Sequence, residues 1–142
     1  MNEVEFKDFY DVLRENLEDY DGDYEDFVNH GPDLFKLLTD VLNENEVTAD
    51  IRLKISAAIA YYVAPFDIIP ETIYGPDGYI DDIFVCLYVL KEIEDEMGFE
   101  FLEELWESDT DLRLTLDECY AKSKDVIDDK KDAILKYVGL IE

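Results

Sequence analysis

The sequence has few basic residues, few cysteines and no long apolar run. Twelve lysine and arginine side chains stand against 38 aspartate and glutamate side chains in 142 residues, for a formal net charge of −26. Such a surface repels nucleic-acid phosphates, so direct nucleic-acid binding is not expected. The longest uncharged stretch, residues 55–66, is shorter than the roughly 20 residues that a membrane-spanning helix needs.

Disulfide and targeting signals are also scarce. Cys86 and Cys119 form no C-x-x-C pair and are too few for a disulfide framework, so we expect two reduced structural thiols. Residues 1–5 are acidic and lack the apolar region of a signal peptide. The sequence therefore predicts a cytoplasmic protein.

Apolar and aromatic residues are abundant despite the charge. Apolar residues make up 48% of the chain, which contains ten tyrosines, eight phenylalanines and one tryptophan. This composition argues against acidic disorder, and the length is typical of one domain. We therefore expect residues 1–142 to form a single domain with a sizeable hydrophobic core.

Apolar residues recur at three- and four-residue steps almost throughout, which predicts an all-α fold of about six helices. The expected helical segments are 6–20, 24–28, 34–42, 48–64, 80–97, 99–106 and 112–137. Segment 24–28 is a short turn, and polar Ser123 and Lys130 predict a break near 123–130.

Local signals refine these helices. Thr48 is an expected N-cap, Pro32 suits a first helical turn, and Ser108 with Asp111 resembles a capping box. The segment 83–90 is apolar on every side, which predicts a helix buried all round.

The most distinctive stretch runs from an apolar helix through a Pro- and Gly-rich connector, residues 65–78, into a second apolar helix. Pro65 ends the first helix nearby, and Asp81 and Asp82 fall in the first turn of the second. The sequence thus predicts a central apolar helical hairpin.

This hairpin resembles the YkvA-like family, also called domain of unknown function 1232, over about residues 51–93. The residues that carry the resemblance are Pro65, Asp67, Ile68, Ile69, Pro70, Glu71, Gly78, Tyr79, Ile80, Asp81 and Asp82. Glu71 stands where the family more often has aspartate, and the loop is one residue longer. The resemblance implies a fold element and no reaction, because no activity is established for the family.

Four hairpin carboxylates, Asp67, Glu71, Asp81 and Asp82, are the candidate metal ligands. A loop that gathered them would suit Mg²⁺ or Ca²⁺, and a carboxylate with a raised pKa would suit acid–base catalysis. The structural alternative makes them helix caps, dipole partners or ion-pair acceptors for Arg52 or Lys54.

Other candidates are weaker on chemical grounds. Asp19, Asp21 and Asp23 alternate like calcium ligands, but the EF-hand glycine and glutamate are missing at positions 24 and 30. His30 is expected at a surface or cap rather than in catalysis. Tyrosines would either line a ligand groove or pack between helices with polar tips. These are Tyr61, Tyr62, Tyr74, Tyr79 and Tyr88.

Three functions fit these patterns, and no catalytic residue or bound cofactor is assigned. The first is a non-enzymatic interaction or regulatory module whose acidic surface, densest over residues 1–46, binds a basic protein partner. The second is a divalent-metal-dependent enzyme or metal-binding regulator that uses the hairpin carboxylates. The third, implied by the resemblance, is peripheral membrane association through the hairpin.

Overall fold

The computed structural model describes residues 14, 15, 17, 26–63 and 80–141, and within them every regular element is helical. The prediction of an all-α fold is confirmed. The elements are the 3-10 helix η1 (Asp26–His30), α2 (Gly31–Leu42), α3 (Ala49–Val63), α5 (Ile80–Met97), α6 (Phe99–Leu105), α7 (Leu112–Ile127), the 3-10 helix η3 (Asp128–Lys130) and α8 (Lys131–Val138). Most of the predicted helix 6–20 lies outside the described residues.

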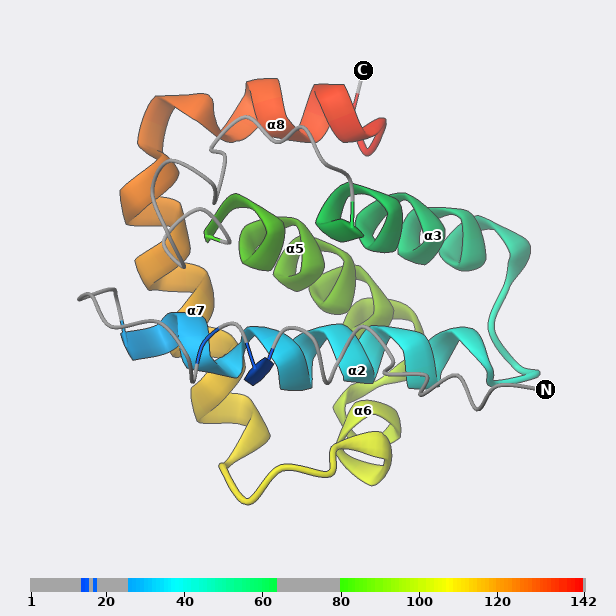
Figure 1. Cartoon of the computed structure of the whole chain (residues 1–142). Helices are drawn as coiled ribbons and strands as arrows, with labels where there is room; N and C mark the ends of the chain where they lie inside the picture. The colour runs from blue at the N-terminus through cyan, green and yellow to red at the C-terminus, as the bar shows by residue number, and fades with distance from the viewer. Residues whose placement is uncertain (1–13, 16, 18–25, 64–79, 142) are drawn as a thin grey trace, which may run out of the picture.

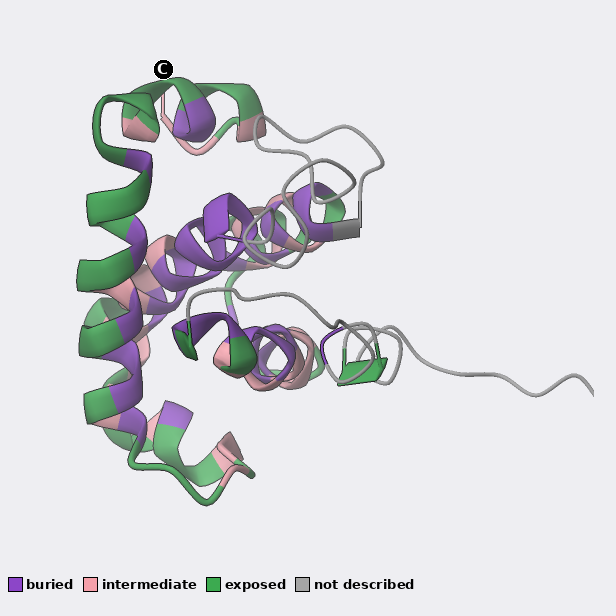
Figure 2. Ribbon diagram, turned by 60° about the vertical axis from the view of Figure 1, so that its left-hand side comes forward, coloured by how far each residue is buried: buried purple, intermediate pink, exposed green. Residues whose placement is uncertain are grey.

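Helix α5 lies at the centre of the molecule and packs against α2, α3, α6, α7 and α8 (Figure 1). Its residues are buried from Ile80 to Leu90, apart from the half-buried Tyr88. The prediction of a helix buried all round is therefore confirmed. Helix α7, in contrast, is buried along one side only and is exposed along its outer face (Figure 2).

The starts of the helices follow from local capping chemistry. Pro32 stands in the first turn of α2, and the Thr48 hydroxyl accepts a hydrogen bond from the Ile51 amide at 3.3 Å before α3, as predicted. The predicted capping role of Ser108 is wrong. Asp111 is the N-cap of α7, and its carboxylate accepts from the Leu114 amide at 3.0 Å. A carboxylate is the stronger acceptor for helix N–H groups, and it also complements the helix dipole.

Two helix ends depend on unusual backbone conformations. Gly98 separates α5 from α6 with φ +91°, a value that glycine adopts without strain. Asp128 has φ +42° and ends α7, after which η3 leads into α8. The predicted break near 123–130 is thus confirmed at residues 128–130.

Several of the scarce basic side chains link neighbouring helices. Lys36 on α2 lies 2.9 Å from Asp40 and 2.8 Å from Glu107, beyond α6. Lys54 on α3 lies 2.9 Å from Glu92 on α5. Each cation therefore holds together elements that would otherwise repel one another through their carboxylates.

Arg113 on α7 forms a similar link, 2.7 Å from Glu94 on α5. Arg52 instead donates to the backbone carbonyls of Leu42 and Glu44, at 2.7 and 2.6 Å. It therefore satisfies carbonyl groups that the end of α2 leaves without helical partners. Among the described residues, Arg52 and Lys54 therefore have partners other than the hairpin carboxylates, and Asp67 and Glu71 lie outside the described residues, so their predicted pairing with Arg52 or Lys54 stays a prediction.

Candidate carboxylate site in the helical hairpin

The structure places two of the four predicted carboxylates in the protein interior. Asp81 and Asp82 occupy the first turn of α5, as predicted, and both are 0% exposed. Asp67 and Glu71 lie outside the described residues. Full burial distinguishes this pair from ordinary dipole partners, which remain at the surface of a helix N-terminus.

Tyr61 connects the two arms of the hairpin at this site. It lies in the last turn of α3, and its hydroxyl donates a hydrogen bond to Oδ2 of Asp81. The Tyr61 side chain is only 4% exposed, and its ring packs edge-on against Tyr137 on α8, with centroids 5.9 Å apart. For Tyr61, the predicted role of a packing residue with a polar tip is confirmed.

Tyr62 packs in the same manner on the next position of α3. Its ring meets Phe35 of α2 edge-on with centroids 5.4 Å apart, and it is 2% exposed. Tyr88 is half-buried against the core, whereas Tyr74 and Tyr79 lie outside the described residues. The described tyrosines therefore contribute to helix packing.

Burying two neighbouring carboxyl groups is expensive in free energy unless their surroundings compensate for the lost water. Among the described residues, the surroundings that compensate include the positive end of the α5 dipole and the Tyr61 hydroxyl on Asp81. The negative charge of Asp82 also acts on Cys86, one turn along α5. The hairpin thus has a polar centre enclosed by apolar helices.

Both cysteines are free and buried, as predicted. Burial raises the pKa of Cys86 well above its ordinary value, and Asp82 adds to the effect. Burial also raises the pKa of Cys119 to about 12, and its thiol lies 3.9 Å from the Phe27 carbonyl oxygen that accepts its weak hydrogen bond. Neither thiol has the exposed, electropositive surroundings of a nucleophile.

We expect both native thiols to resist modification by DTNB near pH 8, because thiolate rather than thiol is the reactive form. Denaturation in guanidinium should release both for rapid reaction. The raised pKa values also mean that these thiols favour folding less as pH rises from about 9 towards 12, because the unfolded chain loses its thiol protons first. Fast stoichiometric labelling of the folded protein would contradict this assignment.

Two of the four predicted metal ligands, Asp81 and Asp82, lie within the described residues. Within residues 14, 15, 17, 26–63 and 80–141, no three His, Cys, Asp or Glu side chains gather closely enough to hold a metal ion. Asp81 and Asp82 supply two adjacent carboxyl groups, and a complete divalent-ion site would take further oxygen ligands from the connector. The prediction for the four carboxylates therefore stays a prediction.

Of the remaining candidates, only His30 lies within the described residues. His30 lies at the junction of η1 and α2 and is half-buried, and its side chain makes no hydrogen bond to the helix N-terminus. Asp19, Asp21 and Asp23 lie outside the described residues. Among the helices that are described, none combines the length and apolarity needed to cross a membrane.

A segment that the sequence analysis did not single out holds the densest described acidic surface. Residues 92–112 contain ten acidic and no basic side chains, from the second half of α5 to the start of α7. Eight of the ten are exposed: Asp95, Glu96, Glu100, Glu103, Glu104, Glu107, Asp109 and Asp111. The signal for it in the sequence is the absence of any basic residue over residues 92–112. We call it the acidic segment.

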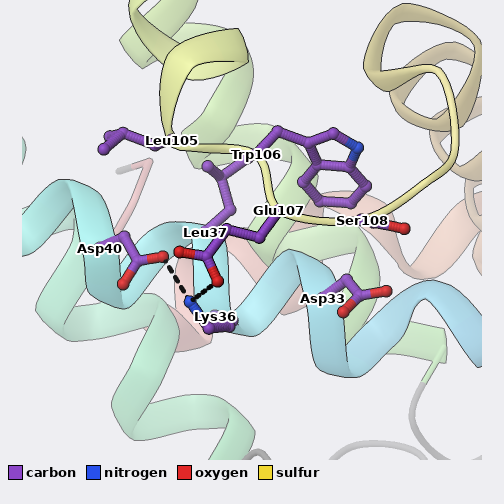
Figure 3. Close-up of a pocket in the computed structure, with 8 residues that line it drawn as sticks. All are labelled: Asp33, Lys36, Leu37, Asp40, Leu105, Trp106, Glu107 and Ser108. Atoms are coloured by element: carbon purple, nitrogen blue, oxygen red, sulfur yellow. Dashed lines mark hydrogen bonds and ion pairs between the residues drawn. The ribbon is translucent and has the colours of Figure 1, made fainter.

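A shallow pocket lies between α2 and the chain that follows α6 (Figure 3). It is lined by Asp33, Lys36, Leu37, Asp40, Leu105, Trp106, Glu107 and Ser108. The pocket encloses about 180 Å³, its open mouth included, and its interior admits only about one water molecule. A substrate would not be enclosed there, so the pocket is unsuited to chemistry that excludes solvent.

Comparison with known proteins finds a family match that falls on the hairpin. Residues 51–88, which cover most of α3 and the first half of α5, match the family described as "Protein of unknown function (DUF1232)". The chain is also similar to "Uncharacterized protein ORF9" of Methanothermobacter thermautotrophicus. The two are 38% identical over 129 residues, which cover 91% of this chain and 88% of the relative. No solved structure matches. Because the similarity extends over nearly all of both chains and the family match falls on the hairpin, this chain belongs to the DUF1232 family of proteins of unknown function.

Proposed function

We propose that this protein is a non-enzymatic interaction module that binds a basic protein partner through the acidic segment. The observation that carries the proposal is the set of exposed carboxylates in this segment that make no ion pair with a described residue. They are Asp95, Glu96, Glu100, Glu103, Glu104 and Asp109. A basic partner would relieve their mutual repulsion on binding.

The apolar residues of the acidic segment support the same function. Phe99, Phe101 and Trp106 are half-buried at its surface and pack partly against the core. Protein interfaces combine aromatic contacts with a polar rim, and charge complementarity accelerates association. A surface with both features favours protein binding over mere solubility.

The test is affinity capture from the native host, followed by titration of the captured partner with three proteins. These are the wild type, a variant with Glu100→Gln, Glu103→Gln and Glu104→Gln, and a matched control with Asp125→Asn, Asp129→Asn and Asp132→Asn. All six positions are exposed, and each variant loses three negative charges. We expect a basic partner that the first variant binds about ten-fold more weakly and the control within about two-fold.

Added salt should weaken binding to the wild type, because it screens exposed charges. A partner without a basic surface, or one that both variants bind equally well, would refute the proposal.

A second candidate function is a divalent-ion-binding regulator, and the complete burial of Asp81 and Asp82 favours it. An enclosed pair of carboxyl groups on a family motif is a good starting point for Mg²⁺ or Ca²⁺ binding. In this proposal, Asp67 and Glu71 supply the remaining carboxylates. The ion would stabilise the hairpin, and its binding would then regulate whatever the hairpin contacts.

Thermal melting with Mg²⁺, Ca²⁺ and Mn²⁺ tests this second candidate. A site saturated about a hundred-fold should raise the melting temperature by roughly 5–10 °C. Asp81→Asn keeps an oxygen acceptor for Tyr61 and should abolish the rise, whereas exposed Asp125→Asn should not. Identical ion responses in the two variants would count against a hairpin site.

A further inference from the structure

The pocket beside α2 is lined by one aromatic ring, Trp106, and by three carboxylates, Asp33, Asp40 and Glu107 (Figure 3). Trp106 stands immediately after α6, where the backbone turns extended, and its indole Nε1 donates to the Thr110 carbonyl oxygen at 2.9 Å. That hydrogen bond fixes the ring, which remains half-exposed. The pocket therefore contains an aromatic surface within reach of solvent, oriented by this hydrogen bond.

The carboxylates of this pocket already hold a cation from the same chain. Lys36 Nζ lies 2.8 Å from Glu107 and 2.9 Å from Asp40. The hydrogen bond to Glu107, followed by that to Asp40, raises the pKa of Lys36 to about 12. Asp33 lines the same pocket. The two carboxylates that contact Lys36 leave this group of three described side chains with a net negative charge.

Another contact in the same molecule shows that an aromatic ring beside a carboxylate can hold an arginine side chain. Arg113 places its guanidinium 4.3 Å from the centroid of the Phe99 ring and 2.7 Å from Glu94. An aromatic face and a carboxylate together thus hold an arginine at the surface of this protein. Trp106 and Glu107 offer the same two groups at the pocket, and the tryptophan face attracts cations more strongly than phenylalanine does.

We propose that this pocket binds an arginine side chain of the basic partner, an inference that rests on the proposed function. The guanidinium lies across the open mouth, over the Trp106 indole, and pairs with Glu107. Lys36 keeps its contact with Asp40. Arginine fits better than lysine, because a planar guanidinium stacks on an indole while it donates in its own plane to a carboxylate.

Trp106 makes the proposal directly measurable, because it is the only tryptophan of the chain. A fluorescein-labelled nona-arginine peptide, followed by anisotropy, measures affinity. The same peptide without the label, followed by tryptophan emission, reports contact at the pocket. We expect saturable binding with a change in Trp106 emission, and weaker binding of the corresponding nona-lysine peptide by about three-fold or more.

Three variants with a matched control locate the binding. Trp106→Leu and Glu107→Gln should each weaken peptide binding about five-fold, whereas exposed Asp125→Asn, which also removes one charge, should change it less than two-fold. Lys36→Met removes the resident competitor and should strengthen binding about three-fold. Circular dichroism and melting curves verify that each variant is folded.

The outcomes separate this inference from the function on which it rests. Peptide binding that leaves Trp106 emission unchanged and is weakened no more by Glu107→Gln than by Asp125→Asn would refute the arginine pocket. The interaction module itself would survive that result. Absence of any salt-sensitive binding of either basic peptide, together with no basic partner from the native host, would refute both.

Discussion

Replacing Phe84 with alanine should lower the free energy of unfolding by about 3–5 kcal/mol. Phe84 is 0% exposed in the middle of α5, and its ring stacks on Tyr120 of α7 with centroids 5.7 Å apart. Because α5 has helices on every side, no single neighbour can move in to fill the space without losing its own contacts. The truncation therefore leaves a cavity as well as removing apolar contacts.

Chemical denaturation measures this loss, and the melting temperature should fall by roughly 10 °C. Leu114→Ala is the matched control, because Leu114 on α7 is 67% exposed and loses little packing. Its free energy of unfolding should change by no more than about 0.5 kcal/mol. A Phe84→Ala protein as stable as the Leu114→Ala protein would mean that α5 is not the centre of the core.

Gly31→Ala should cost about 1–3 kcal/mol through overpacking, although alanine is the better helix former. A Cβ at Gly31 would lie 2.6 Å from the Tyr62 hydroxyl oxygen and 3.3 Å from Cδ1 of Ile83. Tyr62 cannot swing away freely, because it is 2% exposed and its ring packs against Phe35. The glycine is needed because α2 approaches α3 and α5 closely at this point.

A second substitution, at Tyr62, tests whether this contact causes the loss of stability. Tyr62→Phe removes the hydroxyl oxygen that the new methyl group would meet. In the Tyr62→Phe background, Gly31→Ala should therefore cost at least about 1 kcal/mol less than in the wild type, as measured by a double-mutant cycle from denaturation curves. An equal cost in both backgrounds would assign the effect to the backbone instead of to this contact.

Phe84 and Gly31 differ in how far their roles can be predicted from the sequence. The burial of Phe84 follows from the run of apolar residues over 83–90, whose pattern reports a helix enclosed on all sides. The role of Gly31 does not follow from its surroundings in the sequence, where it simply precedes Pro32. Its neighbour Tyr62 lies 31 positions away, and only the packing of α2 on α3 brings them together.

For the hairpin carboxylates too, the position in the chain was predictable from the sequence and the burial was not. The position of Asp81 and Asp82 in the first turn of a helix was predictable from the preceding glycine-rich turn and the apolar run that follows. Their complete burial was not, since charged residues at a helix start are normally solvated. The sequence predicts Tyr61 either to line a ligand groove or to pack between helices, and neither alternative names Asp81 as the partner of its hydroxyl.

The chain has few basic residues, and in the structure three of them link neighbouring elements through ion pairs. By itself, the sequence determined the all-α class, the approximate positions of the described helices and the buried central helix, because these depend on periodicity and capping between near neighbours. Only the tertiary structure decided how Lys36, Lys54 and Arg113 are used, which carboxylates are buried, and that Trp106 and Glu107 share a pocket with α2. These arrangements depend on how helices far apart in sequence pack, and packing is set by side-chain shape and charge across the whole core.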